Sequence, residues 1–351
     1  MDLLIMYKDT IAGKWIDNKF TAVNSALLPL YLQRTGNVEK WLEMRAIDYH
    51  RANSRLLKKA LRLAERDDIS TVISVNAVTI TDNFWVKPTD NDLTYNDVKF
   101  RNDYFATLAL KGTYDSFNRM ANSRHTRTPE LTNTGSFEKC WRLIDGQWWM
   151  YKKANHEELF SELFIYKLGK KLGFNMAEYK RGRGIIKTKD FTNSGAVNFE
   201  AAYSFMGDKE DYIETVKAIK NLDTDKTTKT KIIEDYVKML FLDTICANPD
   251  RHTFNFGLLT DGNTNKIIGL APNFDNNMAL ISKGYPKNIS RKNDILVKLF
   301  NELLEYDGSL KKYVPHINGK IMSEILSDLN MCVKTQTIID FIMNGYNQIQ
   351  H

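Results

Sequence analysis

The clearest alternation of apolar and polar side chains lies in the middle of the sequence. In residues 147–153, Trp148 and Lys152 fall on the same face of a predicted strand, because successive side chains of a strand point to opposite faces. The dipeptide Asp145-Gly146 comes directly before this strand, and Asp-Gly between two β-rich runs favours a tight turn. The pattern therefore predicts a hairpin of residues 137–144 and 147–153.

A period of three to four residues replaces this alternation immediately afterwards. Asn155 is suited to cap a helix, and Glu158 would complete a capping box three residues later. The apolar stripe of the predicted helix includes Glu162, and Gly173 would end the helix. A carboxylate on an apolar face needs a partner, because an unpaired buried charge is costly. A lysine of the preceding strand could supply that partner.

A second helix, which starts at Thr224 or Thr227 and ends near Ala247, is apolar all round at residues 239–242. This pattern predicts a central buried helix, and Asn248-Pro249 would end it. The remaining predictions are a small sheet or hairpin in residues 1–30, a helical region at 38–66, strands at 104–112, 176–179 and 184–187, a loop or short helix at 114–128, short helices at 199–206 and 211–219, a hairpin of 258–259 with 266–268, and amphipathic helices at 293–306, 320–329 and 336–347.

Composition excludes several classes of protein. A chain of 351 residues with a net charge of +6 is long enough for two lobes and too weakly basic to require a nucleic acid partner. Cys140, Cys246 and Cys332 are far apart, which argues against a zinc site or a disulfide framework and fits a reducing cytoplasm. The sequence shows no signal peptide and no apolar run long enough to span a bilayer.

The candidate chemistry lies in residues 248–255 (NPDRHTFN) and, beyond the predicted hairpin, in Asn273-Phe274-Asp275. Asp250 and Asn255 are five residues apart, and Asp275 follows about twenty residues later. Phosphoryl transfer requires such a set: one carboxylate facing the acceptor hydroxyl, and an amide and a carboxylate that hold Mg²⁺. The upstream lysine and Glu162 precede these residues in the order found in kinases, whereas Asp250 and Asn255 alone could simply cap turns.

Other readings of these residues are weaker. The spacing of Asp250 and His252 resembles the opening of a metallophosphoesterase metal site, but the later histidines, His316 and His351, are not in a matching motif. Neither a Rossmann glycine motif nor a Walker A loop is present. A phosphate-cradling role for Gly135 and Ser136 competes with an ordinary turn.

The sequence resembles the HipA-like serine/threonine kinases, including the HipA and CtkA types. The resemblance rests on residues 248–257 (NPDRHTFNFG) and 270–277 (LAPNFDNN), and upstream on 135–139 (GSFEK), 149–152 (WMYK) and 162–173 (ELFIYKLGKKLG). It covers about residues 100 to 350 and is most specific between 248 and 275. Residues 1–100 resemble the divergent N-terminal modules of this family only loosely.

The resemblance implies an α+β, bilobal protein-kinase-like fold with a small β-rich N-lobe and a mainly helical C-lobe. It implies an N-terminal α/β module at residues 1–100, an N-lobe at 101–190 and a C-lobe at 191–351, with a catalytic loop at 248–257 and a metal loop at 273–277. ATP and Mg²⁺ would be the cofactors, and a protein serine or threonine the acceptor. Some family members are toxins restrained by a DNA-binding antitoxin, and some phosphorylate themselves on the phosphate loop.

The roles carried over by the resemblance are specific. Asp250 would be the catalytic base, and Asn255 and Asp275 would bind Mg²⁺. Lys152, positioned by Glu162, would bind the ATP phosphates; the tandem Lys153 is the alternative to Lys152.

The phosphate loop would contribute Gly135 and Ser136, and His252 would brace the catalytic loop. Thr132, Thr134 and Ser136 are the candidate sites of autophosphorylation. A small-molecule kinase of the aminoglycoside or choline type and a non-catalytic pseudokinase remain alternatives to a protein kinase.

Overall fold

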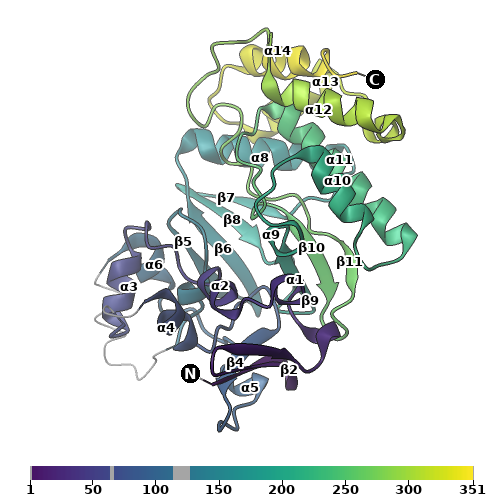
Figure 1. Ribbon diagram of the computed structural model, residues 1–351. Helices are drawn as coiled ribbons and strands as arrows, with labels where there is room; N and C mark the ends of the chain where they lie inside the picture. Colours follow the sequence, from purple (N-terminus) through teal and green to yellow (C-terminus); the bar gives the residue numbers. More distant parts are fainter. Residues whose placement is uncertain (1, 64–66, 114–126, 351) are drawn as a thin grey trace. The chain divides into compact units, whose positions relative to one another are not determined.

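The structure, a computed structural model, describes residues 2–63, 67–113 and 127–350 as a mixed α+β chain (Figure 1). The chain divides into two compact units. Unit 1 comprises Met1–Lys153, Lys187–Glu200 and Thr260–Lys266, and unit 2 comprises Ala154–Ile186, Ala201–Leu259 and Ile267–His351. The predicted division into segments 1–100, 101–190 and 191–351 stays a prediction.

Unit 1 contains the N-terminal sheet, several short helices and the hairpin predicted from the alternating pattern. Its elements are β1 (Leu3–Tyr7), β2 (Thr10–Ile16), β3 (Lys19–Ala22), η1 (Ser25–Leu27), α1 (Leu30–Thr35), α2 (Val38–Glu43), α3 (Ser54–Ala60), α4 (Asp68–Ile73), β4 (Phe84–Pro88), α5 (Tyr95–Val98), α6 (Ala106–Lys111), η2 (Pro129–Thr132), β5 (Lys139–Ile144), β6 (Gln147–Lys153), the Lys187–Lys189 part of β8 (Ile185–Lys189), and all but the last residue of β9 (Val197–Ala201).

The N-terminal sheet has the strand order β3-β2-β1-β4, with antiparallel neighbours. All five residues of β1 are buried, and this inner strand is paired on both edges, with β2 and with β4. The sheet confirms the prediction of a small sheet or hairpin in the first thirty residues. Its packing extends beyond this region, since Leu4 and Met6 pack with Val78 and Trp85.

The predicted hairpin is confirmed as β5 and β6, with Trp141 opposite Met150 in the antiparallel register. Both turn residues have positive φ, 48° at Asp145 and 75° at Gly146, as a tight hairpin turn of the primed type requires. Trp141 and Trp148 meet edge to face and pack against Ile80. The hairpin therefore belongs to the core of unit 1.

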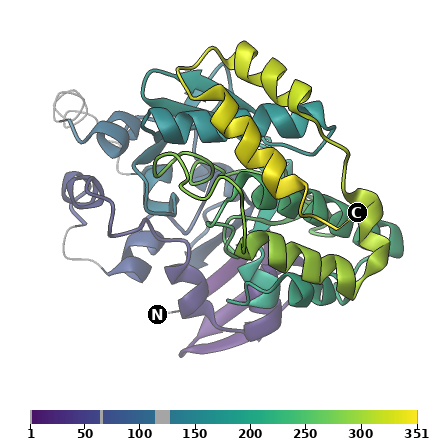
Figure 2. The same cartoon turned by 90° about the horizontal axis from the view of Figure 1, so that it is seen from above.

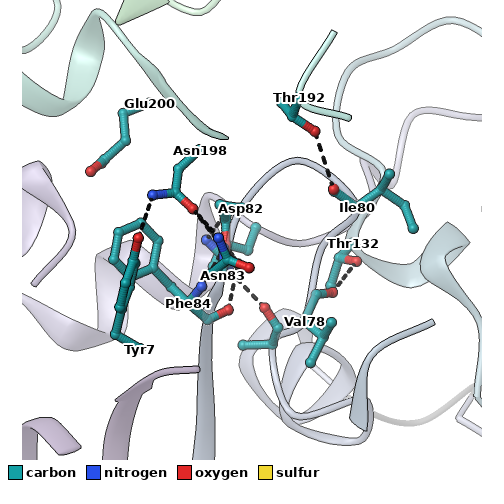
Figure 3. A network of polar contacts seen from close by, with 12 residues as sticks. Tyr7, Val78, Ile80, Asp82, Asn83, Phe84, Thr132, Thr192, Asn198 and Glu200 are labelled. Atoms are coloured by element: carbon teal, nitrogen blue, oxygen red, sulfur yellow. Dashed lines mark hydrogen bonds and ion pairs between the residues drawn. The ribbon is translucent and has the colours of Figure 1, made fainter. Parts of the chain in front are cut away.

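Asn198 on β9 joins distant parts of unit 1 through a buried polar network (Figure 3). Its Oδ1 accepts hydrogen bonds from the backbone N (3.0 Å) and Nδ2 (2.7 Å) of Asn83. Its Nδ2 donates to the hydroxyls of Tyr7 and Thr260, each at 2.9 Å, and to Oδ1 of Asn265 at 3.3 Å. Buried amides need such partners, so the network ties residues near 7, 83 and 260 together.

One prediction in unit 1 is wrong, and another is confirmed only in part. Residues 104–112 contain the helix α6 instead of a strand, and Gly112 ends it in the left-handed conformation with φ 64°. A short apolar run of alanine and leucine does not by itself distinguish a buried helix from a strand. The helical region 38–66 is divided into α2 and α3, and most of the prediction for residues 114–128 lies outside the described residues.

Unit 2 is mainly helical. Its elements are α8 (His156–Lys171), β7 (Tyr179–Gly182), the first two residues of β8, α9 (Tyr203–Met206), α10 (Tyr212–Lys220), α11 (Lys226–Cys246), the Gly257–Leu259 part of β10 (Gly257–Asp261), β11 (Ile267–Leu270), α12 (Ile295–Tyr306), η3 (Gly308–Tyr313), α13 (Gly319–Leu329) and α14 (Thr335–Tyr346). No helix within the described ranges is long and apolar enough to cross a membrane.

The helix α11 is the centre of unit 2, as its apolar segment predicted. It contacts α10, α12, α14 and β11 (Figure 2). Phe241 is fully buried, and its ring lies 6.2–6.4 Å from those of Phe174, Phe300 and Tyr346. The helix is capped by Asp225, which lies between the two predicted starting residues.

The capping box of α8 is confirmed. The Asn155 side chain accepts from the Glu158 backbone N at 2.8 Å, and the Glu158 carboxylate accepts from the Asn155 backbone N at 2.9 Å. The helices predicted at 211–219 and in the C-terminal region are confirmed with small shifts of their ends. The prediction for 199–206 is wrong in its first half, because residues 197–201 form β9.

Candidate functional site

Residues 248–255 form a loop that directly follows α11, and hydrogen bonds at the C-terminus of α11 stabilise the turn between them. Ala247 adopts the left-handed conformation with φ 51°, and the backbone N of Asn248 donates to the Asp243 carbonyl at 2.8 Å. The buried guanidinium of Arg291 donates to the carbonyls of Thr244 at 2.7 Å and Ile245 at 2.9 Å. These bonds satisfy carbonyls that have no partner inside the helix and fix where the loop begins.

Within the loop, Asp250 and Asn255 are in direct contact. The Asn255 Nδ2 donates to the Asp250 carbonyl at 2.7 Å and to its Oδ2 at 3.3 Å. The backbone N of Asp250 donates to the Asn248 side chain at 3.2 Å. Because the amide nitrogen of Asn255 is engaged with Asp250, the amide oxygen is the atom of this side chain that could bind a cation.

The buried side chain of Arg251 stabilises the loop of residues 248–255. Its side chain is almost fully buried and pairs with the buried carboxylate of Asp243, through Nε at 2.8 Å and NH2 at 3.0 Å. Its NH1 donates to the carbonyls of Asn255 at 2.6 Å and Phe274 at 2.8 Å, and its NH2 to the Asn276 side chain at 2.7 Å. One guanidinium thus connects residues 243, 255 and 273–276.

Opposing effects act on the pKa of Arg251. Burial lowers it, but the neighbouring charge of Asp243 and the hydrogen bonds to that carboxylate outweigh burial, with further contributions from Asp275 and Glu162, so the net pKa is raised. The guanidinium therefore stays charged, and the region of unit 2 around Asp250 and Asp275 contains a permanent buried cation.

The segment 273–276 is bound to α8. Glu162, only 1% exposed, accepts from the backbone N of Asn276 with both carboxylate oxygens at 3.0 Å, and from the Asn276 Nδ2 at 3.2 Å. The backbone N of Asp275 donates to the Tyr179 hydroxyl at 2.9 Å, and Asp275 has a positive φ of 60°. A non-glycine residue in this conformation is constrained by its surroundings, and the contact with Tyr179 helps to fix the backbone at Asp275.

His252 contributes to the conformation of the loop. Its Nδ1 accepts from the backbone N of Phe254 at 3.2 Å, and its own backbone N donates to the Asp250 carbonyl at 3.0 Å. The exposed ring of Phe254 stacks on Tyr203 with centroids 4.8 Å apart. The predicted bracing role of His252 is consistent with these contacts and remains a prediction.

The loop of residues 132–136, which contains the predicted phosphate-loop residues Gly135 and Ser136, lies in unit 1. Thr132 is buried, and its hydroxyl donates to the Val78 carbonyl at 2.6 Å (Figure 3). Thr134 and Ser136 are exposed, and Gly135 has a φ of 91°. Of the three candidate acceptors of autophosphorylation, only the last two present their hydroxyls at the surface in this conformation.

Lys152 lies on β6, opposite Lys139, and its Nζ is 4.1 Å from the centroid of the Phe137 ring. Lys153, the alternative, is more exposed at the end of the strand. Lys152 belongs to unit 1 and Glu162 to unit 2, so their pairing remains a prediction. Glu162 binds Asn276 within unit 2, a contact that the sequence interpretation did not anticipate.

Sequence reasoning missed Arg251, Asp243 and Asn276 as site residues. The available signal was a charged residue, Asp243, within the otherwise apolar end of the predicted buried helix. A buried carboxylate needs a cationic partner, and Arg251 is the arginine that follows in the adjoining loop.

The residues of unit 2 fit a magnesium site of the type predicted. No cluster of three or more His, Cys, Asp or Glu residues in the described part of the chain could hold a metal ion. Mg²⁺ does not require such a cluster, because it usually binds one or two carboxylates together with water and substrate phosphates. Asn255 and Asp275 carry amide and carboxylate oxygens of the kind that this mode of binding uses, and their role as Mg²⁺ ligands stays a prediction.

No protein-family model matches the sequence, and the comparison with curated proteins finds no match. Solved structures do match. One is HipA of Shewanella oneidensis MR-1, from a structure of the toxin–antitoxin system HipA, HipB and its operator DNA, with 10% identity, coverage of 98% of this chain and 97% of that chain, and a TM-score of 0.53.

Another is the Helicobacter pylori proinflammatory kinase CtkA, with 15% identity, coverage of 60% of this chain and 90% of that chain, and a TM-score of 0.47. The HipA match extends over nearly the whole of both chains and carries the assignment of fold. The predicted resemblance is therefore confirmed in structure: the chain has a mixed α+β fold like that of HipA.

Proposed function

We propose that this protein is an ATP- and Mg²⁺-dependent phosphotransferase that acts on serine or threonine hydroxyls of a protein. The proposal includes a bilobal kinase-like organisation, with a β-rich lobe that contains Lys152 and a helical lobe that contains Asp250. One observation carries it: Arg251 bonds the carbonyls of both Asn255 and Phe274, so the two predicted loops are parts of one rigid arrangement. The likeness in fold to HipA supports it.

In the proposed reaction, the Asp250 carboxylate accepts a hydrogen bond from the acceptor hydroxyl and takes up its proton during transfer. The contact with Asn255 orients this carboxylate. Asn255 and Asp275 would hold Mg²⁺, which when bound neutralises charge on the phosphates. Arg251 does not touch substrate in this scheme and serves to position both loops.

The other residues would bind and orient ATP. Lys152 would bind the phosphates, and Glu162 would position it. Gly135 and Ser136 would contribute to phosphate binding, and His252 would brace the loop around Asp250. Within unit 2, Glu162 also fixes the backbone at Asn276, next to the proposed Mg²⁺ ligand Asp275.

The biological setting is also part of the proposal. The matched HipA structure includes HipB and operator DNA. We therefore propose a toxin-type regulatory kinase in the cytoplasm, with an antitoxin-like protein partner and no DNA contact of its own. Thr134 and Ser136 would be the accessible sites of autophosphorylation.

Incubation with γ-labelled ATP and Mg²⁺, first alone and then with a cell lysate, tests this function. The proposal predicts label in a protein, either the kinase itself or a lysate component. Label found only in small molecules would favour a small-molecule kinase instead. No turnover of ATP under either condition would contradict the proposal and favour a pseudokinase.

Asp275→Ala tests the proposed metal site separately. Since the carboxylate is one of two proposed protein ligands, its removal should abolish the Mg²⁺-dependent part of ATP binding. Isothermal titration with ATP, with and without Mg²⁺, measures this part. Asp208→Ala, at an exposed position of unit 2, is the matched control and should bind like the wild type. Unaltered Mg²⁺-dependent binding by Asp275→Ala would contradict the assignment.

A further inference from the structure

A segment of the N-terminal region, residues 47–54, lies along the predicted phosphate loop and contacts its surroundings at both ends. At one end, the backbone N of Ile47 donates to the Leu131 carbonyl at 2.9 Å. At the other, the backbone N of Asn53 donates to the Glu138 carboxylate at 3.2 Å. Arg51 lies between these two contacts.

The Arg51 side chain is only 2% exposed and binds three successive carbonyls of the loop. Its Nε donates to Gly135 at 2.7 Å, and its NH2 donates to Thr134 at 3.1 Å and to Asn133. The backbone of Arg51 is itself fixed, since its carbonyl accepts from the Ser54 hydroxyl at 2.8 Å. Arg51 is thus a rigid support for the loop.

The direction of these carbonyls has a consequence for the amides. In a planar trans peptide, the C=O and the following N–H point in opposite directions. The carbonyls of residues 133, 134 and 135 point to Arg51, so the N–H groups of Thr134, Gly135 and Ser136 point away from it. None of these three amides donates a backbone hydrogen bond within the described part of the chain. Successive free N–H groups on one side of a turn form a concavity that binds anions.

We propose that Arg51 is the positioning residue of the phosphate loop and holds the amides of residues 134–136 in the orientation that receives the phosphates of ATP. This inference rests on the proposed function and deepens it, because it assigns part of the nucleotide site to a residue outside the predicted kinase lobes. The sequence predicts only a helical region at residues 38–66 and assigns no role to Arg51. The structure shows it buried against the loop.

Arg51→Gln tests the proposal, with Arg127→Gln as its matched control. Arg127 also lies in unit 1 and also donates to backbone carbonyls, those of Val75 at 3.1 Å and Val98 at 2.9 Å, but not to the loop. Amide hydrogen exchange, followed by mass spectrometry on the full chain, reports local opening without any need for ATP. Arg51→Gln should increase exchange in peptides covering residues 132–141 by about tenfold, through the amides of Asn133 and Trp141, which are hydrogen-bonded to Glu130, whereas Arg127→Gln should leave it unchanged.

Kinetics provide the second measurement. Arg51→Gln should raise KM for ATP by about tenfold, equivalent to the loss of one charge-assisted hydrogen bond, with kcat within about threefold of the wild type. Arg51→Lys retains the charge and one donor. Its exchange rate in the loop and its KM for ATP should therefore lie between those of the wild type and of Arg51→Gln. It also serves if Arg51→Gln does not fold.

Two outcomes overturn the proposal. One is wild-type exchange in the loop of Arg51→Gln. The other is an equal acceleration in Arg127→Gln, which would show general loosening of unit 1. A wild-type protein that neither binds ATP nor transfers phosphate would contradict the proposed function, and the exchange measurement would still decide whether Arg51 positions the loop.

Discussion

Two buried arginines hold the two predicted functional loops, and they do so differently. Arg251, in unit 2, is paired with Asp243, and all three of its guanidinium nitrogens have partners. Arg51, in unit 1, binds only carbonyls, and its buried NH1 has no partner among the described residues. Burial lowers the pKa of Arg51, whereas Asp243 raises that of Arg251.

The difference indicates how firmly each loop is held. A buried guanidinium that is fully paired is expensive to disturb, because any change leaves a charge or a polar group without its partner. A guanidinium with one unpaired nitrogen has already lost part of this stabilisation. The loop around Asp250 should therefore be the rigid part of the site, and residues 132–136 the part that opens more easily.

The largest expected effect comes from breaking the pair in unit 2. Arg251→Gln should destabilise the protein by about 3–5 kcal/mol, because it leaves the Asp243 carboxylate buried without its cation. Urea unfolding followed by circular dichroism measures this change.

The double variant Arg251→Gln/Asp243→Asn should recover part of the loss, since neither charge then remains buried alone. Arg51→Gln should cost less, about 1–3 kcal/mol, because only hydrogen bonds to carbonyls are lost. A larger loss of unfolding free energy for Arg51→Gln than for Arg251→Gln would contradict the conclusion that the loop around Asp250 is the more firmly held of the two.

The next expected effect concerns pH and arises in unit 1. Glu130 is fully buried and accepts hydrogen bonds from the Asn133 side chain and the Trp141 backbone. Burial raises its pKa from 4.5 to about 7, and burial likewise raises the pKa of Glu200 to about 8. Both carboxyls thus keep a proton in the folded protein at pH values where the unfolded chain has released it.

The sign of the pH dependence follows from linkage. The stabilisation from these two protons is fully present below about pH 4.5 and is lost as the pH rises through 7 for Glu130 and 8 for Glu200. The free energy of unfolding should therefore fall between pH 5 and pH 8. Urea titrations at each pH should show a shallower fall for Glu130→Gln and for Glu200→Gln, and a fall unchanged in both variants would contradict the assignment.

Local signals in the sequence predicted much of the architecture. The Asp145-Gly146 turn, the capping box at Asn155 and the buried helix α11 each follow from residues that are close together in the chain. The wrong prediction of a strand at residues 104–112 has a physical reason. The run at 104–112 is apolar without a decisive period, and the helix preference of its alanine, leucine and lysine residues was the signal that the strand prediction passed over.

The candidate site was predictable only in part, because the contacts that fix it join residues that are far apart in the sequence. Asp250, Asn255 and Asp275 are recognisable because their spacing is local. The contacts that fix them, from Asp243 to Arg251 and from Glu162 to Asn276, link residues 8 and 114 positions apart. The contact between Arg51 and Gly135 joins residues 84 positions apart, and no local sequence pattern predicts it.

The central claim is that the rigid loop of unit 2 carries out phosphoryl transfer with Asp250 as the base. The rate of phosphate transfer from γ-labelled ATP by Asp250→Asn, with the Mg²⁺-dependent affinity for ATP measured in parallel, tests this claim most directly. The account predicts a rate lower by about 10²–10⁴-fold, the usual contribution of a positioned base, with affinity little changed. Transfer by Asp250→Asn at the wild-type rate would contradict it.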